Sequence, residues 1–383
     1  MDFAFSADQL AIQSAVREFV RKECPPLLVN QWELDGKYPD AVFRRMAELG
    51  WVGLPFPEEY GGMGGTAVDM CILAEELSRS GYDLSAGFGI RMFCGLNLLH
   101  FGTEEQKRDY LPGLLAGELK FSTSITEAGS GSDAAGLITR AEMVDGGWLI
   151  NGQKLYSTAA HVHNTVIQLF CRTDPDAAKH KGISVFLVPN DTAGVEITRL
   201  KSLGRNLVGT NIIYLTDVFV PDSALLGQFN AGWQVMMSSL LGERLYISAG
   251  YLGAMQSVVD EALAHAKQRT QFGKPIGSFQ VIAHLLADMQ TRTDAARLMV
   301  YRAAAALVAD EDARRLVSEA KLFASENFYA VAGDAMQIMG GAGYMVESTI
   351  QRHFRDARSA TITGGTSQIQ RTIIARTLGL ETE

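Results

Sequence analysis

The chain has 383 residues, of which 47% are hydrophobic and 20% are charged, and its formal net charge is −9. This length allows two or three domains with a large core, and the composition is typical of globular proteins. The negative charge argues against a general nucleic-acid-binding surface, which needs a basic excess. No apolar run approaches the ~18 residues that would cross a bilayer, so membrane insertion is not expected.

The N-terminus and the cysteines indicate a reducing compartment. Asp2, Asp8 and Glu18 interrupt any apolar segment that could serve as a signal peptide. The start at Met1 without a transit segment predicts a bacterial cytoplasmic protein, although a mature organellar form would look the same. The four cysteines form no Cys-x-x-Cys pair and the seven histidines form no His-Glu-x-x-His arrangement. Neither a disulfide framework nor a metal site is therefore expected.

Residues 1–120 predict an N-terminal all-helical domain. The segment Ser6-Ala7-Asp8-Gln9 has the pattern of a capping box that opens a first helix, and Pro25-Pro26 is expected to end that helix. The expected buried side of this helix consists of Leu10, Val16, Phe19 and Val20. Further helices are predicted at 39–49, 68–79, 85–99 and 104–114.

Residues 121–228 predict a middle β-domain, either a barrel or a sandwich. Segments rich in β-branched and aromatic residues occur at 149–153, 165–171, 183–188, 195–200 and 210–220. The first of these strands is expected to run into a turn at Asn151-Gly152.

Residues 229–383 return to a helical pattern. Long segments at 233–268, 278–309, 312–339 and 367–378 predict a C-terminal four-helix bundle. The chain as a whole is therefore predicted to be an α+β multidomain protein.

One carboxylate interrupts the otherwise apolar or small face of the predicted helix 233–268. The residues that share this face, at spacings of three and four, are Met236, Leu240, Glu243, Ile247, Gly250 and Ala254. No cation lies three or four residues from Glu243. Burial would raise the pKa of this carboxyl toward neutrality, which suits a group that must move a proton. The alternative is a partly wet face on which Glu243 points at water.

Four motifs follow one another along the chain. They are Thr-Ser-Ile-Thr-Glu-Ala-Gly-Ser-Gly-Ser-Asp at 123–133, Gly-Gln-Lys-Leu-Tyr-Ser-Thr at 152–158, Arg-Thr-Gln-Phe-Gly-Lys-Pro-Ile at 269–276, and Gln-Ile-Met-Gly-Gly-Ala-Gly-Tyr at 337–344 with Gly-Gly-Thr-Ser-Gln-Ile-Gln-Arg at 364–371. The first is a glycine- and hydroxyl-rich turn that can hold a phosphate or a flavin edge. Together they resemble the acyl-CoA dehydrogenase family of flavoproteins, from about residue 3 to residue 380. The resemblance implies FAD as the cofactor and the three-domain fold predicted above.

The first two motifs imply contacts with the flavin. By resemblance, Ser124, Ile125 and Thr126 meet the isoalloxazine ring, and Ser132 lies near the pyrophosphate and the acyl-CoA chain. Tyr156 and Thr158 alternate across Ser157 on a strand. The resemblance implies that Tyr156 covers the flavin and that the Thr158 hydroxyl reaches the nitrogen that accepts hydride. The family usually has Pro and Ala where this chain has Ala128 and Ser130, so a shifted loop but not a lost site is expected there. Most members have Trp where Tyr156 stands, and a Tyr still offers a stacking face.

The last motifs imply that FAD is shared between subunits. By resemblance, Arg269, Phe272 and Gln280 bind the FAD of a neighbouring subunit, with the guanidinium paired to pyrophosphate. Gln337 and Gly341 resemble adenosine-side contacts, and Thr366 and Gln368 resemble flavin contacts. This sharing requires at least a dimer, and the family's usual dimer of dimers predicts a homotetramer.

The family resemblance also places the catalytic base. In many members a Glu precedes the Gly-Thr of the last loop and removes the α-proton of the substrate, but this chain has Gly364 there. A minority, including isovaleryl- and long-chain acyl-CoA dehydrogenases, carries the base on the long helix, where this chain has Glu243 followed by Arg244. Glu243 is therefore predicted to take the α-proton of an acyl-CoA while the β-hydrogen leaves as hydride to flavin N5, which gives the trans-2-enoyl-CoA. Gly364 would donate its backbone N–H to the thioester carbonyl, and Arg244 would orient the loop or the thioester, unless it is only a surface residue.

Several features leave the substrate open. Gly364-Gly365 is expected to leave room for a branched or bulky acyl group. Arg91 borders the expected acyl pocket, where it would bind a polar acyl terminus, or else it faces solvent. The expected electron acceptor is an electron-transfer flavoprotein. The alternatives are an enoyl-CoA reductase similar to crotonobetainyl-CoA reductase, a dehydrogenase of carrier-protein thioesters, a flavin-dependent oxygenase or oxidase, and a non-catalytic flavin-binding scaffold.

Overall fold

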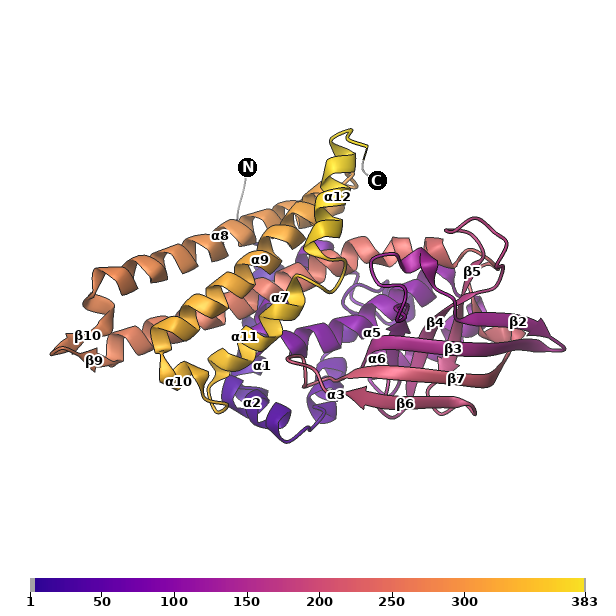
Figure 1. The fold of residues 1–383 in the computed structure, drawn as a ribbon, viewed down its shortest axis with the longest axis horizontal. Helices are drawn as coiled ribbons and strands as arrows, with labels where there is room; N and C mark the ends of the chain where they lie inside the picture. The colour runs from indigo at the N-terminus through magenta and orange to yellow at the C-terminus, as the bar shows by residue number, and fades with distance from the viewer. Residues whose placement is uncertain (1–3, 382–383) are drawn as a thin grey trace.

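The computed structural model describes residues 4–381. The molecule is elongated, with a β-sheet at one end and three long helices that reach away from it to the other end (Figure 1). The N-terminal helices pack between these two parts. The helical, β and helical order predicted from the sequence is confirmed. Within residues 4–381, no helix combines the length and the apolar character that a membrane span requires.

The N-terminal part contains α1 (Ala7–Glu23), α2 (Pro26–Leu34), α3 (Asp40–Glu48), α4 (Ala67–Ser78), α5 (Tyr82–Phe101) and α6 (Glu104–Leu115). The predicted capping box at Ser6 is confirmed, since its hydroxyl accepts from the Gln9 N–H and the Gln9 side chain accepts from the Ser6 N–H. Val16, Phe19 and Val20 are buried as expected. The prediction that Leu10 is buried is wrong. Leu10 is 52% exposed, because most residues in the first turns of α1 face solvent. The pattern also missed α2, where Pro26 occupies the first helical position and its missing N–H costs no hydrogen bond.

The middle part is built from β1 (Lys120–Ser124), β2 (Arg140–Val144), β3 (Gly147–Thr158), β4 (Thr165–Arg172), β5 (Ile183–Pro189), β6 (Val195–Leu200), β7 (Thr210–Pro221) and β8 (Leu225–Leu226). These strands form one sheet in the order β6-β7-β3-β2-β4-β5-β8, and β1 pairs in parallel with β4. The turn expected at Asn151-Gly152 is wrong. Gly152 lies inside β3 at a bulge with φ of +150°, and a Cβ there would lie 2.7 Å from Thr139 Oγ1. The actual turn joins β2 to β3 at Asp145-Gly146.

The C-terminal part contains α7 (Gly232–Gln268), α8 (Gln280–Val308), α9 (Arg314–Met339), α10 (Gly341–Tyr344), α11 (Thr349–Ala360) and α12 (Ser367–Thr377). The helices α7, α8 and α9 lie side by side, and the short strands β9 (Thr270–Gln271) and β10 (Lys274–Pro275) form a hairpin at the end away from the sheet (Figure 1). Both α11 and α12 pack on α9. The long helices match the predicted bundle, while α11 had no counterpart among the predicted segments.

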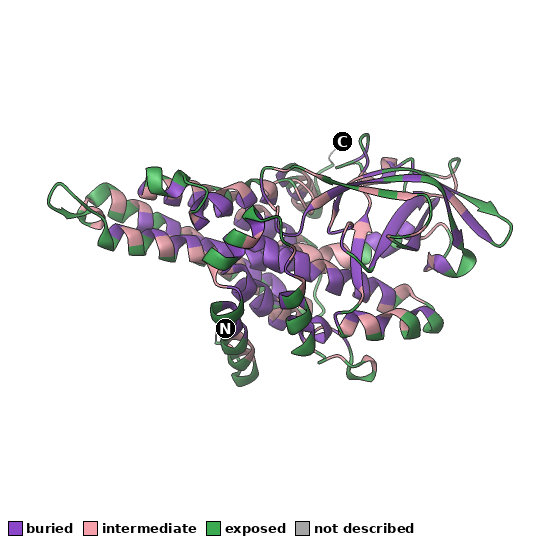
Figure 2. Cartoon of the chain, turned by 90° about the horizontal axis from the view of Figure 1, so that it is seen from below, coloured by how far each residue is buried: buried purple, intermediate pink, exposed green. Residues whose placement is uncertain are grey.

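The main hydrophobic core lies where α7 contacts α4, α5 and α9 (Figure 2). A smaller core around Trp148, Ile150 and Phe186 lies within the sheet domain. Small residues let α4 approach α7 closely, since a Cβ added at Gly253 would overlap the Glu75 carbonyl. This packing fixes α7 against α5 and the sheet, which is where the candidate site lies.

Candidate active site

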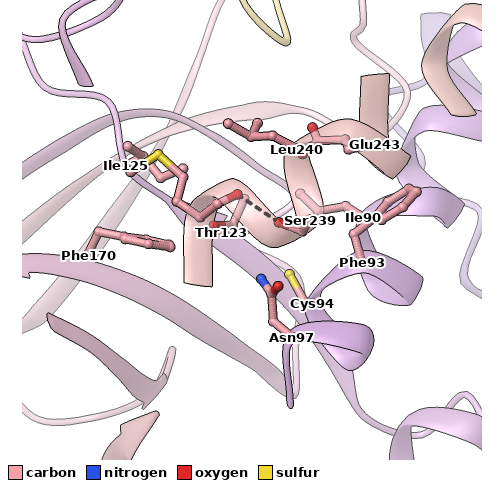
Figure 3. A pocket seen from close by; sticks show the side chains of 11 residues that line it. Ile90, Phe93, Cys94, Asn97, Thr123, Ile125, Phe170, Ser239, Leu240 and Glu243 are labelled. Atoms are coloured by element: carbon pink, nitrogen blue, oxygen red, sulfur yellow. Dashed lines mark hydrogen bonds between the residues drawn. The ribbon is translucent and has the colours of Figure 1, made fainter. Parts of the chain in front are cut away.

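A small cavity lies between α5, the sheet and α7, with a volume of about 370 Å³ when its open mouth is included (Figure 3). The helices α5 and α7 supply most of its wall, and β1 and β4 supply the rest. The lining residues are Ile90, Phe93, Cys94, Asn97, Thr123, Ile125, Phe170, Met236, Ser239, Leu240 and Glu243. The wall is mostly apolar, so a charged group on it is exceptional.

Glu243 is the one carboxylate among the residues that line this wall. It is half-buried, and within residues 4–381 no group donates a hydrogen bond to its carboxylate. Burial raises the pKa of the Glu243 carboxyl, and the charges of Arg244 and Arg205 oppose this rise. A carboxylate that keeps its lone pairs free and holds protons more tightly than usual is suited to accept a proton from a weak carbon acid. The inward position predicted from the helical spacing is confirmed.

The loop between α11 and α12 is held near Glu243 by three side chains. Arg244 Nε donates to the Gly364 carbonyl at 2.9 Å. Lys321 Nζ donates to the Ala360 carbonyl at 2.9 Å and to the Gly365 carbonyl at 2.7 Å. Gln370 Nε2 donates to the carbonyls of Gly364 and Gly365 at 3.2 and 3.1 Å. Arg244 is half-buried and bound to this loop, so the alternative of a plain surface arginine is wrong.

The two glycines of this loop need these anchors. Gly364 and Gly365 have φ of +65° and +88°, which a residue with a side chain adopts only at a cost. Their flexibility in the unfolded chain makes the loop expensive to order, and the three donors offset that loss. Sequence reasoning missed Lys321 and Gln370. A single Lys among the apolar residues of α9 is a signal for the first, and Gln370 lies within the last motif.

The space expected beside Gly364 is not free. A Cβ added at Gly364 would lie 2.7 Å from Cδ1 of Ile247, which follows Glu243 by one turn of α7. Ile247 therefore fills the place that a loop side chain would take. The argument that the missing side chain makes room for a branched or bulky acyl group is wrong.

Arg91 does not border the cavity, and it does not face solvent. It is 2% exposed and donates a hydrogen bond to the Tyr38 hydroxyl, and its guanidinium lies 4.6 Å from the centre of the Phe43 ring. Both expectations for this residue are wrong, because Arg91 lies on the face of α5 that packs against α3.

The predicted flavin loop begins where β1 ends and is fixed by a buried ion pair. Ser124 Oγ lies 2.6 Å from Ser157 Oγ, and the Thr126 carbonyl accepts from the Leu155 N–H at 2.8 Å. Lys154 Nζ lies 2.7 Å from Glu127 Oε1 and also donates to the Ile125 carbonyl at 3.2 Å. The Glu127 carboxylate in turn accepts from the N–H groups of residues 138 and 139. This pair joins the first two motifs, and the opposite charges in those motifs were the signal that sequence reasoning did not use.

The loop and β3 present groups that fit a flavin. Tyr156 has φ of +62° at a break in the β3–β7 register and is 63% exposed, while Ser157 is buried and Thr158 is half-buried. An aromatic face held in a strained backbone conformation is typical of a binding site. Ser132 is exposed, and the buried Ser130 hydroxyl has no partner within residues 4–381. The exposed Tyr156 ring and the unpartnered Ser130 hydroxyl are groups of the kind that a flat ring with polar edges, such as isoalloxazine, would contact.

The remaining predicted cofactor residues lie elsewhere. Arg269, Phe272 and Gln280 are exposed around the β9–β10 hairpin, with Phe272 92% exposed. Gln337 and Gly341, where α9 meets α10, are exposed toward the same end of the molecule (Figure 1). Along α7, Glu243 and Arg269 are separated by roughly 40 Å. One chain therefore does not bring these residues to the cavity.

Thr366 and Gln368 lie at the start of α12. The half-buried Thr366 caps the helix by accepting from the Ile369 N–H at 3.2 Å, and Gln368 is exposed. Both line a shallow depression together with Tyr329 and Arg358. Both residues follow shortly after Gly364 and Gly365, at the point where the loop between α11 and α12, here called the glycine loop, continues into α12.

Comparison with known proteins agrees with this arrangement. The N-terminal, middle and C-terminal domain models of acyl-CoA dehydrogenase match residues 6–118, 122–218 and 230–379. A probable acyl-CoA dehydrogenase of Bacillus subtilis is 38% identical over 99% of this chain and 100% of its own. A caffeyl-CoA reductase–Etf complex subunit of Acetobacterium woodii is 36% identical over 97% and 98%.

The fold agrees as well. The structure of butyryl-CoA dehydrogenase from Megasphaera elsdenii matches with a TM-score of 0.94 and 30% identity, over 99% of this chain and 100% of that chain. The motifs, the three-part fold and the inward carboxylate thus have one explanation, which is that the chain belongs to the acyl-CoA dehydrogenase family of FAD-binding oxidoreductases.

Proposed function

We propose that this protein oxidises the Cα–Cβ bond of an acyl-CoA thioester to the trans-2-enoyl-CoA, with Glu243 as the base that takes the α-proton. The observation that carries this proposal is a carboxylate on the wall of an apolar cavity that accepts no hydrogen bond from the part of the chain that the structure describes. FAD, when bound, accepts the β-hydrogen as hydride at N5. The basicity of Glu243, the backbone N–H of Gly364 and the cofactor-binding residues supply the remaining requirements of this reaction.

Glu243 must match its basicity to a weak carbon acid. A carboxylate with the ordinary pKa of ~4.3 is a poor base for an α-C–H. Burial raises the pKa of Glu243, and a substrate that fills the cavity removes further water from it. The same burial keeps the protonated form from losing its proton to solvent before the β-hydrogen has left.

The glycine loop supports the proposed stabilisation of the thioester carbonyl. We assign the Gly364 N–H as a donor to that oxygen, where negative charge develops as the α-proton leaves. A donor of this kind acts only when its backbone is fixed, and Arg244, Lys321 and Gln370 fix it by donating to the carbonyls of Gly364 and Gly365. Arg244 therefore acts as a positioning residue that joins the helix of the base to the loop of the donor.

A second copy of the chain completes the cofactor site in this proposal. Ser124, Ile125, Thr126, Ser132, Tyr156, Thr158, Thr366 and Gln368 would hold the flavin side, while Arg269, Phe272, Gln280, Gln337 and Gly341 would hold the FAD of a neighbouring subunit. The separation of the two groups within one chain supports this division. The proposed assembly is a homo-oligomer, as the family's dimer of dimers, and a cytoplasmic location stays a prediction.

The reverse reaction is the second candidate. The relatives include a protein named a dehydrogenase and a protein named a subunit of a reductase–Etf complex, at similar identity. In the reductive direction the protonated Glu243 would return a proton to the α-carbon. The name of the second relative supports an electron-transfer flavoprotein as the redox partner. The alternatives of a carrier-protein thioester dehydrogenase, a flavin-dependent oxygenase or oxidase, and a non-catalytic scaffold stay predictions.

Anaerobic bleaching of the flavin by a panel of acyl-CoAs tests the proposal. Glu243→Gln should lower the bleaching rate by about 10²–10⁴-fold, since that is the usual contribution of a general base. Glu196→Gln is the matched control, because Glu196 is exposed on β6. Bleaching that is absent in the parent protein, or unchanged in Glu243→Gln, would refute the proposed function.

A further inference from the structure

The side-chain amide of Asn97 is another polar group on the wall of the cavity that contains Glu243. The helices α5 and α7 run in opposite directions here, since Gly242 faces Phe93 and Val235 lies near Phe101 across Gly227. Asn97 follows Phe93 by one turn of α5, so it lies about 6 Å along the cavity from the level of Glu243. Figure 3 shows Asn97 next to Cys94 on the α5 side of the cavity.

The orientation of this amide is determined by its neighbours. Gln168 on β4 donates through Nε2 to the backbone carbonyl of Cys94 at 2.7 Å. A carbonyl can only accept, so the Gln168 amide oxygen must face Asn97. Asn97 Nδ2 donates to that oxygen at 3.0 Å. The Asn97 amide oxygen is thereby turned away from Gln168.

The Asn97 oxygen is buried and unsatisfied. Asn97 is 5% exposed, and its Oδ1 has no hydrogen-bond partner within residues 4–381. Most side chains around it on the cavity wall are apolar, among them Phe93, Phe170 and Met236. The Ser239 hydroxyl on the opposite wall donates to the carbonyl of Met236 in its own helix at 3.3 Å. A buried acceptor without a donor is costly, and a ligand that donates to it recovers that cost.

We propose that Asn97 is a specificity-determining residue that selects acyl groups carrying a hydroxyl or an N–H about one helical turn from the α-carbon. This inference rests on the proposed function, because it takes the Glu243 end of the cavity as the place of the α-carbon. Oδ1 accepts the hydrogen bond of the donor group, and the aromatic and aliphatic wall contacts the carbons between. A methyl group in the same place leaves Oδ1 buried without a partner. The preference for the donor over the methyl should be roughly ten- to a hundredfold, since sites that bond a substrate hydroxyl discriminate strongly against its absence.

The test compares two thioesters on the FAD-loaded protein. One is an ω-hydroxyacyl-CoA whose chain places the hydroxyl about 6 Å from the α-carbon, which is close to one helical turn. The other is the alkanoyl-CoA of the same length in which a methyl replaces the hydroxyl. The ratio of kcat/KM from anaerobic flavin bleaching should favour the hydroxyl compound by about tenfold or more. Asn97→Leu should bring this ratio to one or below. A parent protein that prefers the methyl compound would overturn the assignment of Asn97. The assignment would also fail if Ser239→Ala abolished the preference for the hydroxyl compound while Asn97→Leu kept it.

Equilibrium binding of the same pair separates this inference from the proposed function. Calorimetric titration of the parent protein with its FAD reduced beforehand measures the two dissociation constants without turnover, because a reduced flavin cannot accept the β-hydride. Tighter binding of the hydroxyl compound without bleaching by either thioester would mean that the proposed function fails while the role of Asn97 stands. Bleaching by both thioesters with equal affinities would mean that the proposed function stands while the role of Asn97 fails. The parent protein alone gives both results, so they do not depend on the folding of a variant.

Discussion

Gly364 and Ile247 occupy one space, so their substitutions should not be additive. Gly364→Ala would keep φ of +65°, which costs about 1–2 kcal/mol for a residue with a side chain. Its Cβ would also lie 2.7 Å from Ile247 Cδ1, which forces Ile247 from its rotamer at about 1 kcal/mol. The single substitution should therefore lower the free energy of unfolding by about 2–3 kcal/mol.

Removing the opposing methyl group should relieve part of this loss. Ile247→Val deletes Cδ1 and costs about 1 kcal/mol by itself. When it is present, Gly364→Ala should cost only the backbone component, so the double-mutant cycle should show about 1 kcal/mol of favourable coupling. Gly36→Ala is the matched control, because Gly36 has the same φ of +65° but nothing within 4 Å of its Cβ position.

The assay is urea-induced unfolding of the FAD-loaded proteins, followed by far-UV circular dichroism and compared at equal m-value. The control should show no coupling to Ile247→Val. Coupling below about 0.3 kcal/mol for Gly364→Ala would refute the packing argument, since additive behaviour is the property of sites that do not touch. An equal cost for the two glycine substitutions would refute it as well.

Three further predictions follow from buried charges and from the split cofactor site. Burial lowers the pKa of Lys321 to about 7, whereas the unfolded chain titrates this group near ~10.4. Between these two pKa values the unfolded state binds one proton more than the folded state, so the free energy of unfolding rises with pH in that window. Lys321→Met should lower the slope of the free energy of unfolding against pH by the amount that one proton contributes. Urea unfolding at a series of pH values measures this slope. Glu127→Gln should leave the buried Lys154 charge unpaired and lower the free energy of unfolding by about 3–5 kcal/mol. Adding Lys154→Met should recover part of this stability, and the same urea assay measures both variants. Equal stability of the single and double variants would contradict this reading. Arg269→Ala should weaken FAD retention on gel filtration without changing the secondary structure, because Arg269 is exposed far from the cavity of its own chain.

Local sequence patterns predicted most of the fold. The long helices α7, α8 and α9 follow from sustained apolar spacing, and the start of α1 follows from its capping box. The same spacing predicted the inward position of Glu243. Elements whose burial depends on tertiary partners were missed. In α11, for example, Arg352, His353 and Asp356 are buried charged or polar residues, and a polar sequence of this kind looks like a solvated segment.

The parts of the site that sequence could not predict are those where distant segments meet. Ile247 fills the space beside Gly364 only because the loop after α11 folds against α7. Arg91 is buried because Tyr38, just before α3, and Phe43 on α3 cover it. The Asn97–Gln168 pair joins α5 to β4 across residues far apart in sequence. Periodicity assigns a face to each residue, but it does not determine which element covers that face.

Isotope exchange at the α-carbon measures the removal of the α-proton, the step proposed for Glu243, by itself. The FAD-loaded protein is incubated anaerobically in D₂O with an acyl-CoA that bleaches its flavin, and deuterium at the α-carbon is followed by mass spectrometry. The role of Glu243 as the base requires exchange by the parent protein and by Glu196→Gln, and a loss of about 10²–10⁴-fold in Glu243→Gln. Exchange at the parent rate in Glu243→Gln would contradict it.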